Sequence, residues 1–338
     1  MGESGRLFQI FSERIRRILE EFRKGADGIE EVRIRAGAPL FVICRDQEYM
    51  VGAEAGFRVS AKDVEETLQC AARYSLYAYE EELRQGFLTV QGGHRIGVAG
   101  RVVAEGGRIR TIQPVTFLNV RFAHQVCGCA DGVMPFLLEE QTGNLRNTLF
   151  ISPPRCGKTT LLRDVIRQVS DGVPVPYGAA VPGSLTAPDG DSGGRRRSFT
   201  VGVVDERSEI AACFQGIPQN DVGVRTDVLD GCPKALGMML LIRSMAPEVV
   251  AVDEIGSKED LDALRYVMNC GCRILATVHG TSMEDIEKKP GLGEFLRERR
   301  FERYVVLGNA RGPGTVRNIS DGSGNCLYHG DRRNAVCG

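Results

Sequence analysis

Residues 147–160 constrain the fold of this chain more than any other stretch. An apolar run at 148–151 leads into a short loop, and apolar residues at helical spacing follow from 160 to about 170. The loop is close to the phosphate-binding pattern G-x-x-x-x-G-K-[ST], with Ser152 at the first glycine and Gly157, Lys158 and Thr159 completing it. The order strand, loop, helix therefore predicts a nucleotide-binding loop. The alternative is an ordinary strand, turn and helix.

Each part of this loop has a chemical role in the prediction. Gly157 lets backbone N–H groups approach a phosphate, Lys158 reaches the β- and γ-phosphates, and the Thr159 hydroxyl holds Mg²⁺. The positive end of the following helix points at the anion. The residues that we expect to contact the nucleotide are Ser152, Pro153, Pro154, Arg155, Cys156, Gly157, Lys158, Thr159 and Thr160.

The C-terminal part of the chain alternates apolar strands with helical segments, which is typical of a parallel α/β sheet. Residues 172–198 interrupt it with a stretch rich in Pro, Gly, Ser and Asp that ends in three arginines, and we interpret this stretch as a flexible insertion. A solvated loop is favoured there over a binding site for phosphate or an acidic partner. Strands are expected at 148–151, 199–204, 249–252, 273–276, 301–307 and 315–319.

The N-terminal part has a different texture, with helical segments followed by short strands that glycines interrupt. This pattern predicts a smaller α+β domain over 1–125 and a linker over 126–146 that holds a helix at about 134–140. An α/β nucleotide-binding domain is expected over 147–320, and a loose tail over 321–338. The expected N-terminal helices are 8–22, 64–72 and 75–84, and the strands are 31–35, 40–43, 87–90, 95–103, 108–112 and 119–122.

Carboxylates follow two of the expected parallel strands, at the sheet edge where ligands bind. Asp253 is expected to bind Mg²⁺ through water, and Glu254 to orient and deprotonate an attacking water. The alternative is an acidic helix N-terminus. Glu209, with Asp205 and Glu206, follows the neighbouring strand.

His279 and several arginines complete the candidate site. His279 ends the expected strand at 273–276, where a γ-phosphate sensor would stand, although a lone histidine is more often structural. Guanidinium groups stabilise the charge that develops in phosphoryl transfer. Arg110 and Arg121 are our candidates for reaching a nucleotide on a neighbouring subunit, with surface decoration as the alternative. Arg95, Arg101 and Arg225 are further candidates for this role.

Composition narrows the remaining possibilities. The formal net charge of −1 provides no global field for nucleic acid, so no nucleic-acid partner is expected. The chain offers no run with the composition of a membrane span and no signal peptide. Eleven cysteines and four histidines, without a C-x-x-C pair, disfavour a zinc site and favour reduced thiols in the cytoplasm.

Several long stretches resemble the stage III sporulation AA family of endospore-forming bacteria. That family belongs to the secretion superfamily of ATPases, which includes the type II and type IV secretion and pilus motors. The resemblance covers about residues 30–310. The matching stretches are 74–86, 92–97, 151–154, 204–210, 225–234, 241–245, 252–256 and 276–280.

The resemblance implies a RecA-like P-loop ATPase core with an N-terminal α+β domain. It also implies ATP and Mg²⁺ as cofactors, hexameric rings with ATP at subunit borders, and peripheral attachment to membrane-embedded subunits of an export complex between mother cell and forespore. Arg155 stands where the family pattern has glycine, and Cys272 stands at the first histidine of its histidine box. Asp205, Glu206 and Glu209 match its acidic box, and Gly271, Thr277 and His279 match its histidine box.

The predicted function is an ATP-hydrolysing motor of a secretion-type export channel used in endospore formation. The alternatives are a nucleotide-gated ring scaffold with little turnover and a P-loop kinase of a small substrate. Glu254 favours hydrolysis over the scaffold, and the sequence has no recognisable lid or acceptor site for a kinase. The expected partners are copies of this chain and the membrane subunits. The expected location is cytoplasmic, at the periphery of a membrane complex.

Overall fold

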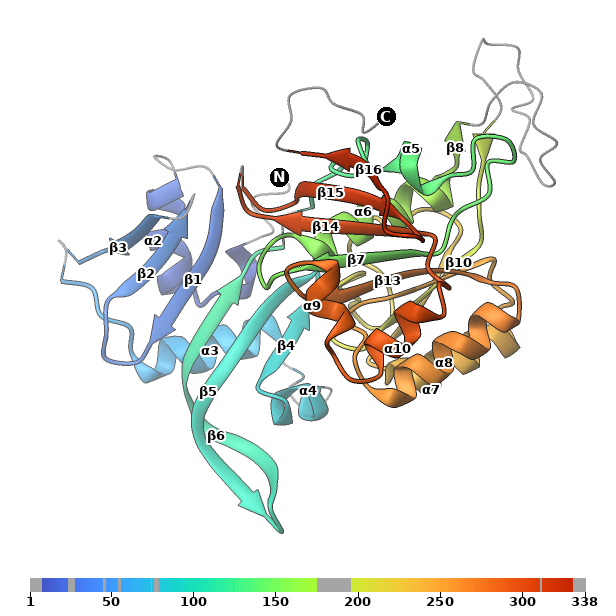
Figure 1. Ribbon diagram of the computed structural model, residues 1–338. Helices are drawn as coiled ribbons and strands as arrows, with labels where there is room; N and C mark the ends of the chain where they lie inside the picture. Colours follow the sequence, from blue (N-terminus) through green and yellow to red (C-terminus); the bar gives the residue numbers. More distant parts are fainter. Residues whose placement is uncertain are drawn as a thin grey trace, which may run out of the picture. The chain divides into compact units, whose positions relative to one another are not determined.

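A computed structural model describes residues 8–23, 28–44, 47–53, 56–73, 75, 79–123, 125–174, 196–310 and 312–330. The chain divides into two compact units, Met1–His124 and Gln125–Gly338 (Figure 1). Each unit has its own sheet and its own buried side chains.

The N-terminal unit is a six-stranded antiparallel sheet in the order β3-β2-β1-β6-β5-β4. Strand alternation places Val32 and Ile34 of β1 in the core, while Arg33 and Arg35 lie on the opposite face. Helix α3 begins at a capping box in which Ser60 and Asp63 satisfy each other's backbone N–H groups. The elements are η1 Phe8–Ile10, α2 Glu13–Arg23, β1 Ile29–Arg35, β2 Leu40–Cys44, β3 Gln47–Val51, α3 Ala61–Ala71, α4 Glu80–Arg84, β4 Phe87–Val90, β5 His94–Glu105 and β6 Arg108–Arg121.

The structure differs from the expected N-terminal elements in four places. The helix expected at 8–22 is the short η1 followed by the separate helix α2. Strand β6 joins two expected strands, because β5 pairs with it along nearly its whole length through three register shifts. Strand β3 was not expected; four of its five residues are exposed, so it lacks a strong apolar signal. The helix expected at 75–84 is only α4, and residues 74 and 76–78 lie outside the described part.

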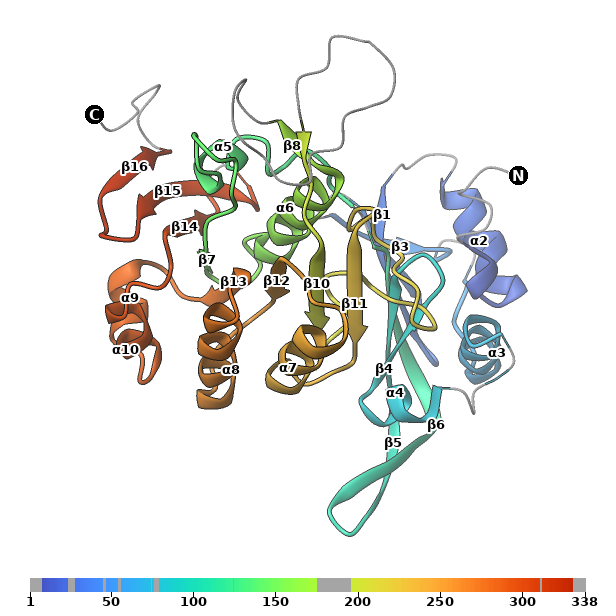
Figure 2. The same cartoon turned by 90° about the vertical axis from the view of Figure 1, so that its right-hand side faces the viewer.

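The C-terminal unit is a three-layer α/β structure. Its sheet has the order β11-β10-β12-β13-β7-β14-β15-β16, in which the first six strands are parallel and the last two are antiparallel. Helix α6 covers one face, and α7 and α8 cover the other (Figure 2). The elements are α5 Met134–Leu137, β7 Thr148–Ser152, α6 Lys158–Asp171, β8 Val173–Pro174, β9 Arg196–Arg197, β10 Val201–Asp205, β11 Thr226–Asp230, α7 Lys234–Ser244, β12 Val249–Val252, α8 Lys258–Asn269, β13 Arg273–His279, α9 Met283–Glu287, α10 Leu292–Arg297, β14 Arg303–Gly308, β15 Thr315–Asp321 and β16 Cys326–His329.

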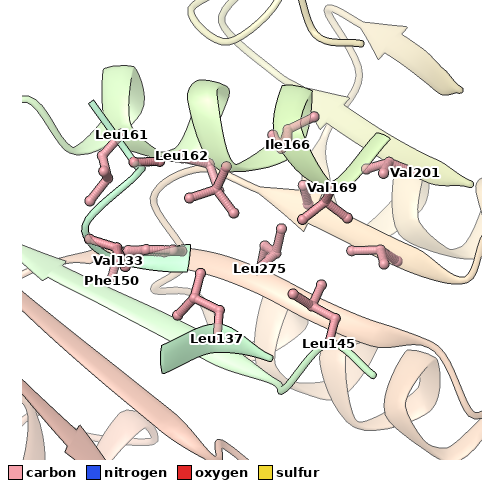
Figure 3. Close-up of a cluster of buried hydrophobic side chains, with 14 of the residues drawn as sticks. Val133, Leu137, Leu145, Phe150, Leu161, Leu162, Ile166, Val169, Val201 and Leu275 are labelled. Atoms are coloured by element: carbon pink, nitrogen blue, oxygen red, sulfur yellow. The ribbon is translucent and has the colours of Figure 1, made fainter. Parts of the chain in front are cut away.

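Burial explains why the central strands form. All residues of β7, β10 and β12 are buried, as expected for strands covered by helices on both faces. Helix α6 places its apolar stripe on this sheet, and Leu162 and Ile166 belong to one buried cluster with Phe150 and Leu275 (Figure 3). Residues 153–157 alone connect the end of β7 to the start of α6.

The segment expected as a linker and the expected loose tail both belong to this unit's structure. Val133 and Leu137 lie in the core beside α6, so residues 130–145 are packed rather than free (Figure 3). The tail prediction is wrong for residues 321–330: β15 ends at Asp321, and β16 pairs with β15. Apolar Leu327 and Tyr328 are too few to signal a strand in sequence, but the exposed edge of β15 provides a partner.

The insertion prediction falls mostly on residues 175–195, which lie outside the described residues. Its two ends pair as the short β8 and β9. Among the helices that the structure describes, none combines the length and the apolar character needed to cross a bilayer.

Candidate functional site

The loop after β7 turns tightly against the β14–β15 turn. Gly157 has φ +80°, and a Cβ there would lie 2.7 Å from the backbone nitrogen of Gly314. The Gly314 N–H donates to the Cys156 carbonyl at 2.8 Å. Arg155, in place of the family's glycine, also has a positive φ of +60°, which costs a non-glycine residue some free energy. The loop therefore keeps its turn with an arginine at that position.

The backbone of this loop has the features of an anion site. Among the described residues, no acceptor contacts the backbone N–H groups of Arg155, Cys156 or Gly157. Helix α6 begins at the next residue with no side-chain cap. Free N–H groups at a turn and at a helix N-terminus together attract phosphate. Ser152 differs from these residues, since it is buried and its hydroxyl donates to the Pro153 carbonyl at 2.8 Å.

The remaining loop residues have separate positions. Pro154 and Arg155 are exposed, and Cys156 is buried. The carbonyl of Thr160 accepts a weak hydrogen bond from the Cys129 thiol at 3.7 Å. Burial raises the pKa of that thiol to about 11, so Cys129 is a neutral packing residue at neutral pH.

Lys158 joins the two predicted nucleotide motifs. Its side chain is buried, and its Nζ lies 2.5 Å from Oε1 of Glu254 and 3.3 Å from Oδ1 of Asp253. Register explains this closeness, because β7, β13 and β12 are adjacent parallel strands whose carboxyl ends meet. The expected juxtaposition of Lys158 with both carboxylates is therefore present.

The hydroxyl of Thr159 donates to Oδ2 of Asp253 at 2.6 Å. Thr277 donates to the other oxygen of the same carboxylate. A hydroxyl and a carboxylate at this distance are hard oxygen donors of the kind that Mg²⁺ takes. These residues fit the cation expected at Thr159 and Asp253.

Glu254 lies among three nitrogen donors. Besides Lys158, His279 Nε2 lies 2.8 Å from its Oε1 and Arg207 Nη1 lies 3.0 Å from its Oε2. The residue has φ +58°, and its N–H donates to the Thr277 hydroxyl at 2.9 Å. Burial raises the pKa of Glu254, but the hydrogen bond and charge of Lys158, with His279, outweigh it and lower the pKa. Glu254 is therefore an ionised carboxylate at neutral pH.

Asp205 organises the loop that carries the acidic stretch. It is buried and accepts backbone N–H groups from Glu209 at 2.8 Å, Ile210 at 3.0 Å and Ala211 at 2.8 Å. Burial raises the pKa of Asp205 to about 6. Arg163 of α6 holds the same loop by donating to the Ile210 carbonyl at 2.5 Å. Asp205 thus shapes the loop through its contacts with these backbone N–H groups.

Glu206 and Glu209, the other two acids of this stretch, have different neighbours. Glu206 forms an ion pair with Lys234 at the start of α7. Within the described ranges, Glu209, Asp253 and Glu254 are the one group whose ligand atoms lie close enough for a metal, within 4.8 Å of one another. No described cysteine or histidine takes part in that group. Glu209 therefore lies beside the two carboxylates of the site, as the sequence predicts.

His279 ends β13 and points at Glu254. Its Nδ1 is buried and has no hydrogen-bond partner among the residues that the structure describes, whereas 43% of the side chain is exposed. Lys289 donates to the His279 carbonyl and so ties the strand end to the region after α9. The contact through Nε2 places the ring at the site, which a purely structural histidine would not require.

The predicted arginines, Arg110 and Arg121, belong to the N-terminal unit, and their contacts are given within that unit alone. Within its own unit, Arg110 pairs with Glu105 at 3.1 Å, and Arg121 lies 3.5 Å from Glu31. Arg225 precedes β11, at the amino end of a parallel strand, so it lies at the sheet edge opposite the loop. Arg225 therefore lies away from the site of its own subunit.

Sequence analysis missed Arg207. It stands between Glu206 and Glu209 in the acidic stretch, and a charged residue in a loop is usually solvated. The contact with Glu254 depends on the turn at 206–208, which strand periodicity does not reveal.

Comparisons with known proteins identify the family and the fold. The family described as "Sporulation stage III, protein AA" matches residues 2–327. Stage III sporulation protein AA of Bacillus subtilis (strain 168) is 42% identical over 301 residues, which cover 88% of this chain and 89% of that protein.

Two solved structures share the fold. The ATPase DotB of Legionella pneumophila has a TM-score of 0.53 at 13% identity, covering 87% of this chain and 75% of that one. DotB of Yersinia pseudotuberculosis has a TM-score of 0.52 at 10% identity, covering 88% and 75%. These likenesses confirm the predicted RecA-like α/β core with a smaller N-terminal α+β domain. By the match along nearly its whole length, the chain belongs to the sporulation stage III protein AA family.

Proposed function

We propose that this protein is an ATPase that drives a secretion-type export complex in endospore formation. Its site binds ATP with Mg²⁺ and hydrolyses the β,γ-phosphoanhydride bond. The observation that carries the proposal is the contact of Glu254 with Lys158, at the meeting point of the phosphate loop and β12. A carboxylate beside the phosphate-binding lysine is where a base for water is needed.

Each residue has a task in this reaction. The free N–H groups of the loop and Lys158 hold the β- and γ-phosphates, while Thr159 and Asp253 hold Mg²⁺. The bound ion supplies positive charge at the phosphate oxygens. Glu254 takes a proton from water as the water oxygen bonds to the γ-phosphorus. The bond to the β,γ-bridging oxygen then breaks, and ADP and inorganic phosphate leave.

His279 and Glu209 assist Glu254. His279 donates to Oε1 of Glu254, the oxygen that Lys158 also contacts. His279 therefore orients the base and senses whether a γ-phosphate has displaced this contact. Glu209 lies close enough to Asp253 and Glu254 to take part in the water and metal network. Both proposed roles rest on the short distances of His279 and Glu209 from Glu254 and on the polar character of these side chains.

The motor acts as a ring of copies of this chain, with ATP at each border and with Arg110 or Arg121 of one copy reaching the nucleotide of the next. It works at the periphery of membrane-embedded subunits of the export complex. Support for this assembly comes from membership in a sporulation family and from the fold shared with the ATPase DotB.

Steady-state release of phosphate from the purified protein tests the proposal. We expect ATP-dependent release that requires Mg²⁺ and that stops with Glu254→Gln. A ring scaffold, the alternative, would bind ATP and assemble but release no phosphate above the Glu254→Gln background. A kinase would release ADP only when a small acceptor is added, and the phosphoryl group would appear on that acceptor instead of as free phosphate.

A further inference from the structure

Arg207 occupies a position that no step of the reaction above uses. It follows β10 in the short turn between Asp205 and Glu209, and its Nη1 lies 3.0 Å from Oε2 of Glu254. Its side chain remains 63% exposed. In the described part of the chain, Glu254 is the one group that pairs with its guanidinium.

The turn that carries Arg207 is fixed on both sides. Asp205 accepts the backbone N–H groups that follow the turn, and Ser208, with φ +52°, bonds the Asp230 carboxylate through its hydroxyl. Glu206 is tied to Lys234. The backbone at Arg207 is thus held in place, while the long side chain keeps the freedom to change partner.

Arg207 and Lys158 contact different oxygens of the same carboxylate. Lys158 Nζ meets Oε1 of Glu254, and Arg207 meets Oε2. Arg207, Glu209, Asp253 and Glu254 line one small cavity, together with Asp205, Glu206 and Lys234. A γ-phosphate that takes Lys158 away from Glu254 would therefore enter within reach of the Arg207 guanidinium.

The negative charge of the site with ATP bound favours movement of the Arg207 guanidinium toward the γ-phosphate. Glu209, Asp253 and Glu254 already place three carboxylates around the site, and ATP adds further negative charge. A guanidinium binds phosphate oxygens in a planar, bidentate way that Lys158 cannot match. Freed from Arg207 and Lys158, Glu254 can accept the proton of the attacking water.

We infer that Arg207 is a catalytic arginine acting in cis, which exchanges Glu254 for the γ-phosphate when ATP binds to its own subunit. It then stabilises the charge on the γ-phosphoryl oxygens while water attacks phosphorus and Glu254 takes the proton. The inference rests on the proposed ATPase function and adds a residue to it. Arginines that act in cis contribute to other nucleotide hydrolases.

The first experiment compares Arg207→Ala and Arg207→Lys with wild type in ADP affinity and turnover. Arg243→Ala, at an exposed arginine of α7, is the matched control. We expect Arg207→Ala to bind ADP within about twofold of wild type and to lose about 10³-fold in kcat. Arg207→Lys should recover part of the rate, since it restores charge without the planar fork. Wild-type turnover by Arg207→Ala would overturn the inference.

Mixing experiments decide between action in cis and in trans. In an equimolar mixture of Arg207→Ala and Glu254→Gln, no site combines both wild-type residues if Arg207 acts in cis, so activity should stay at the sum of the two variants. Recovery of activity in this mixture would show that Arg207 serves a neighbouring site and would overturn the inference.

A failure of the proposed function is distinguishable. If wild type releases no phosphate, ATPase activity is refuted, and the contact with the γ-phosphate is then measured by binding alone. We expect Arg207→Ala to lower the affinity for the slowly hydrolysed analogue ATPγS about tenfold more than the affinity for ADP. An unchanged ratio of the two affinities would overturn the role of Arg207 by itself.

Discussion

Lys158 Nζ lies 2.5 Å from Oε1 of Glu254. The ammonium group proposed to bind phosphate is therefore paired with the carboxylate proposed to deprotonate water. Binding of a γ-phosphate to Lys158 would release Glu254 in the same step. Under the proposed function, this coupling would keep the carboxylate of Glu254 paired until ATP binds.

Replacing Lys158 should weaken ATP binding and also lower the free energy of unfolding. We expect Lys158→Ala to lower ATP affinity by roughly 10–150-fold, because a charge-assisted contact with phosphate is lost. Asp253 and Glu254 would lose a shared cation in a buried place, so the free energy of unfolding should fall by about 1–3 kcal/mol. Lys258→Ala, at an exposed lysine of α8, is the control for both calorimetry and urea unfolding. Wild-type affinity in folded Lys158→Ala would contradict the assignment of the loop.

Replacing His279 should change function more than stability. His279→Ala removes a contact with Glu254 from a side chain that is 43% exposed. We expect slower turnover and a smaller preference for ATP over ADP, while the melting temperature stays within about 2 °C of wild type. His329→Ala, on β16, serves as the control. A large fall in melting temperature with unchanged relative affinities would instead indicate a structural histidine.

The pKa of Asp205 makes a prediction about stability and pH. Because burial raises the pKa of Asp205 in the folded protein to about 6, the folded state binds this proton more tightly than the unfolded state. Its stabilisation is complete below about pH 4 and is lost as the pH rises through 6. Urea unfolding should show wild-type stability falling over this range relative to Asp205→Asn, by at most about 1.4 kcal/mol per pH unit. Parallel pH profiles for the two proteins would contradict the raised pKa.

The sequence predicted those parts of the site that depend on local pattern and strand order. A buried strand before Gly157 and another before Asp253 were sufficient, because carboxyl ends of parallel strands meet at one edge. The positions of Lys158, Thr159, Glu254 and His279 follow from that rule. Their mutual distances agree with the expected geometry.

Features that depend on packing between distant residues could not be predicted. Strand β11 was missed because its residues are half-buried at a sheet edge, so Arg225 was weighed for the site although it lies at the other end of the strand. Strand β16 has only four residues, too few for a periodic pattern, and depends on pairing with β15. The contact between Arg207 and Glu254 requires a turn with a positive φ at Ser208, which no periodicity reveals.

Hydrolysis is expected to depend on assembly. We expect Arg110→Ala or Arg121→Ala to bind ATP and turn over slowly, because an arginine supplied across a subunit border can be worth about 10³–10⁵ in rate. Mixing either variant with Glu254→Gln should restore part of the activity, because a mixed ring contains some intact borders. This outcome is opposite to the one predicted for Arg207→Ala. Equal specific activity in monomeric and assembled preparations would contradict a trans-acting arginine.

Phosphate release by wild type and by Glu254→Gln, measured at equal ATP occupancy, tests the central claim most directly. Glutamine keeps the size of the side chain and a hydrogen-bonding oxygen but cannot take a proton from water. The account predicts ATP binding close to that of wild type and turnover lower by about 10²–10⁴. Turnover at the wild-type rate by Glu254→Gln would contradict the account, because the base would then have to be another residue.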